Sequence, residues 1–197
     1  YGDHRDLHLS IRRQRQMCIR DRTKSQYLKV IESSRKVFKD KNSDYGSSRR
    51  ILRFSSFVYQ IHINAQRIRN LQINKDQKID EGQVPEFIGI INYCIMSLIQ
   101  IQIGVVDEPD LNGTEVVELY DNKVNETFEL MLKKNHDYGE AWRDMEISSL
   151  TDLIIQKIFR MKSINSNDGK TISSEGVESN FQDILNYSVF ALILLKA

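Results

Sequence analysis

Apolar residues recur every three or four positions over most of the chain, which is the period of an amphipathic α-helix. The segment from Ser25 to about Lys41 carries Leu28, Ile31, Val37 and Phe38 between charged residues. A segment from about Val116 to Lys134 has the same pattern, with Leu119, Val124, Phe128, Leu130, Met131 and Leu132. Both segments are therefore predicted to be helices that bury one face.

The same periodicity predicts four further helices. Two begin near the Ser-Ser pairs at 55–56 and 148–149, and two cover Val84–Ile103 and Val177–Lys196. Pro85 is tolerated near the start of its helix. Asp-Tyr-Gly triplets place Gly46 and Gly139 where the earlier helices would end. The long helical periods and the presence of only two prolines argue against a sheet.

The chain contains an internal repeat. KNSDYGSSRR (residues 41–50) recurs as KNHDYGEAWR (residues 134–143), and SSFVYQIHINAQRIR (residues 55–69) parallels SSLTDLIIQKIFRMK (residues 148–162). EGQVPEFIGIINY (residues 81–93) parallels EGVESNFQDILNY (residues 175–187), shifted by one extra residue. We predict an all-α fold, a helical bundle of two tandem three-helix repeats in one compact domain. Repeat one covers 23–103, a linker covers 104–117, and repeat two covers 118–197.

The segment Tyr1–Arg22 is predicted to be foreign to this domain. RRQRQMCIRD back-translates to CGT CGG CAG CGT CAG ATG TGT ATA AGA GAC, which resembles the transposon-end adapter of tagmentation sequencing libraries. YGDHRDLH fits TAC GGC GAC CAC CGA GAT CTA CAC, which resembles the flow-cell sequence at the outer end of the same libraries. Leu9–Ile11 would then correspond to a sample index. We interpret the segment as translated adapter that takes no part in the fold.

Setting this segment aside changes the charge balance. It holds six of the 28 basic and three of the 27 acidic residues, so the net charge moves from +1 to −2. The remaining balance gives no electrostatic support for direct binding of nucleic acid or a membrane. Cys94 becomes a lone cysteine, which excludes an intramolecular disulfide and fits a reducing cytoplasm. No apolar run approaches the roughly 18 residues that span a bilayer.

Several motifs resemble a known bacterial and phage family, the nucleotide modification associated domain, the first of its series and formerly a domain of unknown function. They are DYG followed by Trp-Arg, SSLTDLI-QKI-R, the Glu-Gly before the third helix, and D-x-x-NY, and the likeness runs from about Lys24 to the end. The family is named for genes near enzymes that make modified nucleotides, so the resemblance implies a nucleotide-related context. A vaguer likeness to all-α nucleotide pyrophosphatases implies acidic residues that hold magnesium, although the ExxE and ExxD signature of those enzymes is absent.

Repeat two carries a candidate site for metal and phosphate. Its polar residues are Asp152, Lys157 and Arg160 on the second helix, Glu175 and Glu178 near the start of the third, and Asp183, Asn186 and Tyr187 along the third. Asp152, Glu178 and Asp183 would offer the oxygen ligands that Mg²⁺ prefers, and Lys157 and Arg160 would take phosphate charge. Asp152, Asp183, Lys157 and Arg160 are therefore the candidate catalytic residues of a magnesium-dependent phosphohydrolase.

The candidate ligand-binding residues are Asp137, Tyr138, Trp142, Arg143, Asn186 and Tyr187. Trp142 and Arg143 are of types that stack on a nucleobase. Structural roles are the alternatives: Trp142 as a core residue and Asp137-Tyr138 as part of a turn. Asn186 and Tyr187 recur as Asn92 and Tyr93, which equally suits a hydrogen bond between helices.

The charged candidates also have structural alternatives. Asp152 follows Ser149 by three residues and would suit a capping box, and Lys157 and Arg160 would suit a solvated face. Where repeat two has Trp142, Asp152, Lys157 and Asp183, repeat one has Arg49, Tyr59, Asn64 and Gly89, although Arg67 corresponds to Arg160. This difference predicts a degenerate scaffold copy beside a working copy, with drift at exposed positions as the alternative.

Two functions follow from these residues. The first is a magnesium-dependent nucleotide phosphohydrolase, and the second is a non-catalytic helical module that binds nucleotides or docks onto a nucleotide-modifying enzyme. His62 and His136 match no ligand spacing for zinc. An oligomer is compatible with either function.

We expect deletion of residues 1–22 to leave the thermal midpoint unchanged, because a translated adapter contributes no packing to the bundle. Calorimetry of the full chain and of residues 23–197 measures the two midpoints. A large drop in the truncated chain would assign the segment a structural role.

Overall fold

The computed structural model describes residues 3–74, 82–166 and 176–196, with side chains from residue 21 onward and up to residue 164 in the second range. The helices are α1 (Asp3–Tyr45), α2 (Phe54–Ile73), α3 (Gln83–Ile103), α4 (Gly113–Tyr138), α5 (Ile147–Ser166) and α6 (Val177–Leu194). Short 3-10 helices, η1 (Ser48–Ile51) and η2 (Ala141–Asp144), follow α1 and α4. No strand occurs in these ranges, so the all-α repeat is confirmed.

Both first helices end where the glycines predict. Gly46 and Gly139 have φ of 60° and 64°, the left-handed region in which glycine carries no Cβ penalty. The start of α4 differs from the prediction near Val116. Asn112 accepts from the backbone N–H groups of Thr114 and Glu115, while Glu115 accepts from Asn112 N–H at 2.9 Å. This capping box starts the helix three residues earlier and shortens the predicted 104–117 linker.

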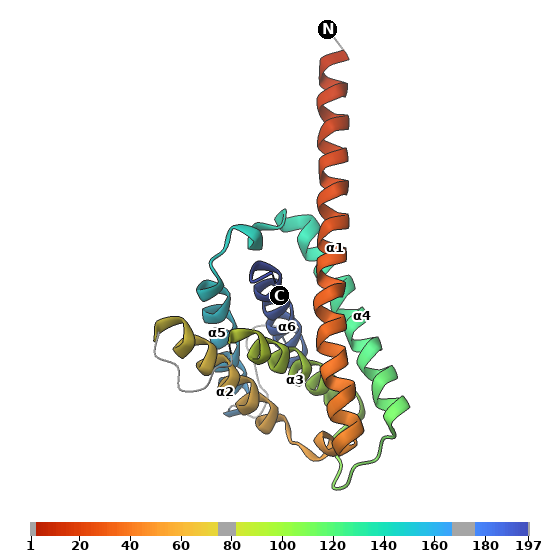
Figure 1. Ribbon diagram of the computed structural model, residues 1–197, viewed down its shortest axis with the longest axis vertical. Coiled ribbons are helices and arrows are strands. Elements are labelled where there is room, and N and C mark those ends of the chain that lie inside the picture. The colour runs from red at the N-terminus through yellow and green to blue at the C-terminus, as the bar shows by residue number, and fades with distance from the viewer. Residues whose placement is uncertain (1–2, 75–81, 167–175, 197) are drawn as a thin grey trace.

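The first helix also extends beyond its predicted start at Ser25. α1 begins at Asp3, and Figure 1 shows its first half projecting past the other helices. The first buried side chain of the described part of α1 is Thr23. The interpretation of residues 1–22 as adapter remains a prediction.

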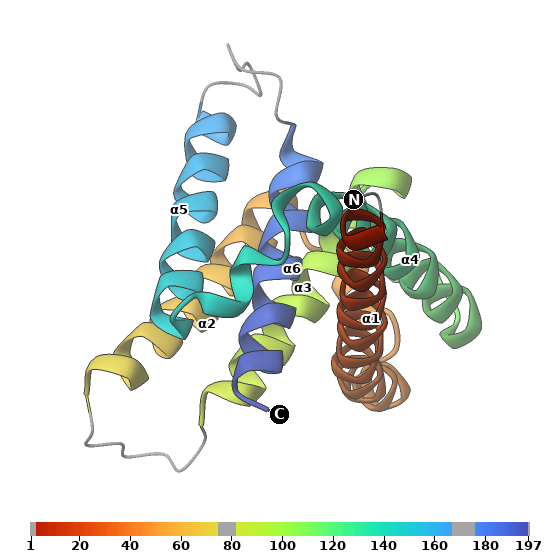
Figure 2. The same cartoon turned by 90° about the horizontal axis from the view of Figure 1, so that it is seen from above.

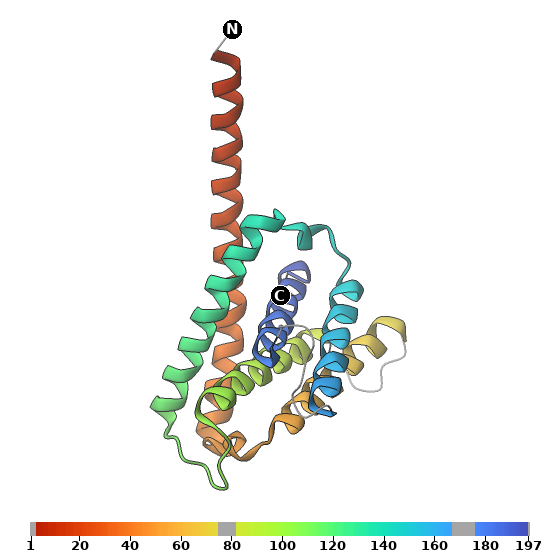
Figure 3. The same ribbon diagram turned by 180° about the vertical axis from the view of Figure 1, so that it is seen from behind.

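The six helices form three neighbouring pairs. Figures 1 and 2 show α1 beside α4 on one side, α2 beside α5 on the other, and α3 crossing α6 between them. Figure 3 shows the same order from behind. The central pair supplies many of the fully buried apolar residues, including Phe87, Ile91, Ile95, Phe181 and Ile184. Burial of this apolar surface is the main force that holds the pairs together.

The prediction that no apolar run approaches the length of a membrane span is wrong for α3. α3 is long and apolar enough to cross a bilayer by length and composition, and 61% of its most apolar 18-residue window is buried inside the fold. Its packing against α2, α6, α1 and α4 explains the composition, because a helix that is covered over most of its surface has only a small polar face.

The two repeats exchange hydrogen bonds through their first and third helices. Tyr27 of α1 donates to Asn186 Oδ1 of α6 at 2.8 Å, and Tyr120 of α4 donates to Asn92 Oδ1 of α3 at 2.9 Å. The shift that relates Lys41 to Lys134 also relates Tyr27 to Tyr120, and Asn92 corresponds to Asn186. Each repeat therefore contributes a tyrosine to the asparagine of the other, in a reciprocal arrangement.

Burial keeps these tyrosines as donors. It raises the pKa of Tyr27 and Tyr120 far above the ordinary value of a phenol, so both hydroxyls stay protonated. Asn92 also donates to the backbone oxygen of Ser34 at 3.1 Å, which ties α1 to the Tyr120–Asn92 pair. The amide of Asn92 thus joins α1, α3 and α4.

A buried arginine holds the connection between the repeats. Arg50, fully buried after α1, donates to Asp110 at 2.8 and 3.0 Å, to the oxygen of Gly104 at 2.6 Å, and to Gln100. The hydrogen bond from Arg50 lowers the pKa of Asp110. The segment between α3 and α4 is therefore attached to Arg50 through the Asp110 carboxylate and the backbone oxygen of Gly104.

We expect Tyr27→Phe and Tyr120→Phe each to lower the free energy of unfolding by about 1–2 kcal/mol, because each leaves a buried asparagine oxygen without its donor. Urea denaturation followed by circular dichroism measures the loss. Tyr45→Phe is the control, because this side chain is 71% exposed. Equal stability of all three variants would contradict a role for the reciprocal bonds.

Candidate functional site

Asp183 is the centre of the polar cluster in repeat two. It lies on α6, is 9% exposed, and accepts from Lys134 at 2.5 Å and from Lys157 at 2.8 Å. Lys134 comes from the last turns of α4 and Lys157 from the middle of α5, so three helices meet at one carboxylate. We name Lys134, Lys157 and Asp183 the lysine–aspartate cluster. Sequence analysis identified Lys157 and Asp183 but missed Lys134, because only the tertiary fold brings α4 to this point.

Asp152 lies elsewhere. Its side chain is 62% exposed and pairs with Arg69 of α2 at 3.7 Å. The repeat shift relates this pair to Tyr59 and Lys162, whose ammonium lies 4.7 Å from the Tyr59 ring centroid. Asp152 is thus half of a repeated contact between α2 and α5. The prediction that it shares an ion with Asp183 is not supported, because the two carboxylates have different partners.

The capping alternative for Asp152 is also wrong. α5 begins at Ile147, so Ser149 already lies inside the helix and is not the residue that precedes it. The exposed ion pair with Arg69 accounts for Asp152 instead, and such pairs contribute little to stability.

The described residues do not fit a magnesium site. Both oxygens of Asp183 accept from lysines, Glu178 is exposed in the first turn of α6, and Glu175 lies outside the described residues. Within the described ranges, no three His, Cys, Asp or Glu side chains lie close enough together to hold a metal. Arg160 is partly buried one turn beyond Lys157, where it adds a further cation to α5.

Trp142 and Arg143, which were predicted to stack on a nucleobase, contact other residues of the fold instead. The Trp142 ring stacks on Phe190 with centroids 4.3 Å apart, and the Arg143 guanidinium covers Trp142 at 4.3 Å. Arg143 also donates to Glu140 at 2.6 Å, to Gln26 at 2.9 Å and to Thr23. Trp142 therefore packs in the core, and Arg143 fastens η2 to α1.

The contacts of Asn186 and Tyr187 agree with the structural alternative, in which these side chains connect or pack helices. Asn186 is buried and accepts the hydrogen bond from Tyr27, and Tyr187 is partly buried against the core. The recurrence of the asparagine in both repeats thus reflects the reciprocal packing.

Repeat one has no room for a side chain at the position that corresponds to Asp183. The amide of Asn64 lies so close to Gly89 that a Cβ at Gly89 would collide with it. A different ion pair joins α2 to α3 here, with Arg67 2.9 Å from the largely buried Glu86. Each repeat therefore has an ion pair between its second and third helices, but the two pairs form at positions that do not correspond in the repeat.

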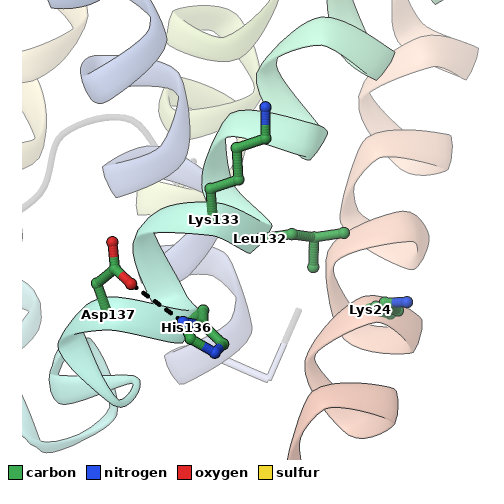
Figure 4. Close-up of a pocket in the computed structure, with 5 residues that line it drawn as sticks. All are labelled: Lys24, Leu132, Lys133, His136 and Asp137. Carbon is green, nitrogen blue, oxygen red and sulfur yellow. Dashed lines mark hydrogen bonds and ion pairs between the residues drawn. The ribbon is translucent and has the colours of Figure 1, made fainter.

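Asp137 and Tyr138 lie on the surface at the end of α4, and Tyr138 is 75% exposed. Asp137 lines an open pocket of about 410 Å³ with Lys24, Leu132, Lys133 and His136 (Figure 4). Asp137 Oδ1 lies 3.0 Å from His136 Nδ1. We name these five residues the α1–α4 pocket. Sequence analysis missed its cations, because Lys24 joins them only through tertiary packing, although the run Lys133-Lys134-Asn135-His136 was a signal of positive charge.

Comparison with known proteins identifies a family. The family model described as nucleotide modification associated domain 1 matches residues 41–101 and 134–195. Neither a curated protein nor a solved structure matches the chain. The two segments begin at the equivalent Lys41 and Lys134, which confirms the tandem copies. They are narrower than the likeness inferred from Lys24 onward, because most of α1 and α4 lies outside them.

We expect Asp183→Asn to lower the free energy of unfolding by about 2–4 kcal/mol, because two lysines would then share a largely buried site without a carboxylate. Chemical denaturation measures the change. Asp152→Asn is the matched control, and its exposed pair predicts a change below about 0.5 kcal/mol. Equal losses in both variants would contradict a central role for Asp183.

Proposed function

The chain belongs to the nucleotide modification associated domain 1 family, and from this premise we propose that it binds nucleotides without hydrolysing them. The family description gives the nucleotide context. The observation that favours binding over chemistry is the state of Asp183, whose two oxygens accept from Lys134 and Lys157. A carboxylate held between two ammonium groups orients them, and their positive charge disfavours a metal cation at the same oxygens.

The lysine–aspartate cluster would contact the phosphate of the nucleotide. Two ammonium groups surround one carboxylate, which leaves an excess of positive charge among these three side chains. The Lys134 side chain is 43% exposed and its ammonium has three donors, so it can donate to a phosphate while it keeps Asp183. Lys157 is the more buried lysine and holds Asp183 in place from α5.

Magnesium-dependent hydrolysis, the other candidate, would place a divalent cation beside the two ammonium groups that Asp183 already holds. Asp152 and Glu178 would also have to leave the positions described above. For these reasons we do not propose hydrolysis as the function, and the assay below tests for it. A cytoplasmic location would place the chain with its nucleotide ligand.

The test uses the full chain with a panel of nucleosides, deoxynucleoside monophosphates and deoxynucleoside triphosphates, with and without magnesium. Calorimetry measures binding, and chromatography of the incubated nucleotides measures turnover. We expect phosphorylated nucleotides to bind and to remain intact. Lys134→Met should weaken binding by at least about tenfold, because a charge-assisted hydrogen bond is worth about 1.5–3 kcal/mol and about 1.4 kcal/mol corresponds to tenfold.

Lys39→Met is the control, because Lys39 is exposed on α1 away from this cluster. Phosphate release abolished by Asp183→Asn would replace the proposal with the hydrolase. Failure of every nucleotide to bind would favour docking onto a nucleotide-modifying enzyme.

A further inference from the structure

We propose that the α1–α4 pocket is a second anion site, which binds the phosphates of a nucleoside triphosphate or of free polyphosphate. The inference shares its ligand chemistry with the function proposed above but rests on different side chains. Lys24 extends from α1, Lys133 and His136 come from α4, and Leu132 lies between them (Figure 4).

The charge of the pocket favours an anion. Two lysines and a histidine line the pocket together with one carboxylate, that of Asp137. Asp137 contacts His136 at Nδ1, so the other ring nitrogen, Nε2, points away from this carboxylate. Lysine ammonium groups are compact point charges that bind phosphate oxygens without a fixed orientation.

The two walls of the pocket are fixed before any ligand arrives. Thr23 and Gln26, which flank Lys24, both accept hydrogen bonds from Arg143. On the opposite wall, Lys134 follows Lys133 directly and is held by Asp183. A site whose backbone is already ordered loses less conformational entropy on binding.

The size of the pocket favours several linked phosphates over one. Its volume of about 410 Å³ lies within the range of about 300–1,000 Å³ that is typical of small-molecule sites. Cations occur on both walls, so the proposed ligand is an extended anion that would reach from Lys24 to Lys133.

The repeat comparison shows that the fold does not require these cations. The repeat shift relates Lys133 to Asp40, His136 to Ser43, and Lys24 to Val117. The equivalent positions thus carry no positive charge, although α1 and α4 pack in the same reciprocal way. Lys24, Leu132 and Lys133 lie outside the segments that match the family model, whereas His136 and Asp137 lie inside the second segment.

The experiment measures binding of tripolyphosphate, a deoxynucleoside triphosphate and a nucleoside to the full chain by calorimetry at constant ionic strength. The variant carries Lys24→Gln and Lys133→Gln. The matched control carries Lys29→Gln and Lys39→Gln, two exposed lysines of α1. We expect the pocket variant to weaken tripolyphosphate binding at least tenfold and the control to change it less than twofold. The thermal midpoint of each variant verifies that it is folded.

The other arms separate the two proposals and the two ligand sources. Loss of tripolyphosphate binding in the pocket variant, with little change in Lys134→Met, supports the pocket independently of the lysine–aspartate cluster. The pocket proposal is overturned if Lys134→Met alone abolishes binding, if both lysine pairs have equal effects, or if the unaltered chain does not bind tripolyphosphate. Tighter binding of the triphosphate than of tripolyphosphate would identify a nucleotide as the ligand, and equal binding would identify polyphosphate.

Discussion

The reciprocal hydrogen bonds between Tyr27 and Asn186 and between Tyr120 and Asn92 are the constraint on which the architecture depends. Apolar packing of α3 against α6 is strong but allows many arrangements, because apolar contacts have little directional preference. A buried amide without a partner is costly, so the tyrosines restrict which neighbours α3 and α6 can accept. The outer helices α1 and α4 are thereby each tied to the third helix of the opposite repeat, and the α1–α4 pocket lies between them.

The fold could largely be predicted from the sequence because its signals are local. Gly46 and Gly139 mark the ends of α1 and α4, and the duplicated blocks fix how many helices to expect. The start of α4 was misplaced because the Asn112–Glu115 capping box lies in a segment that otherwise reads as a linker. The candidate site was harder to predict, because ion pairs depend on which helices meet. Asp152 and Lys157 lie on one helix, yet Asp152 pairs with α2 and Lys157 with α6.

Lys134 shows why only part of the lysine–aspartate cluster could be predicted from the sequence. Its sequence neighbours indicate an exposed end of a helix, and nothing local predicts that its ammonium reaches Asp183 on α6. Trp142 is the opposite case, a residue that was predicted to contact a ligand but packs in the core. Its residue type suits stacking on a base, but Phe190 and Arg143 already cover its ring. In both cases residue type indicates the chemistry available, and tertiary contacts decide what that chemistry is used for.

The reciprocal packing has a consequence for how such a protein changes over time. Two identical subunits that pair in this way would receive every substitution twice, once in each partner, so a new charge would have to be tolerated on both sides. Here the two halves are joined in one chain, and a substitution enters one half alone. Asn64 against Gly89 and Lys157 against Asp183 are two independent solutions at equivalent positions. Covalent joining of the halves thus permits specialisation of one of them while the other preserves the scaffold.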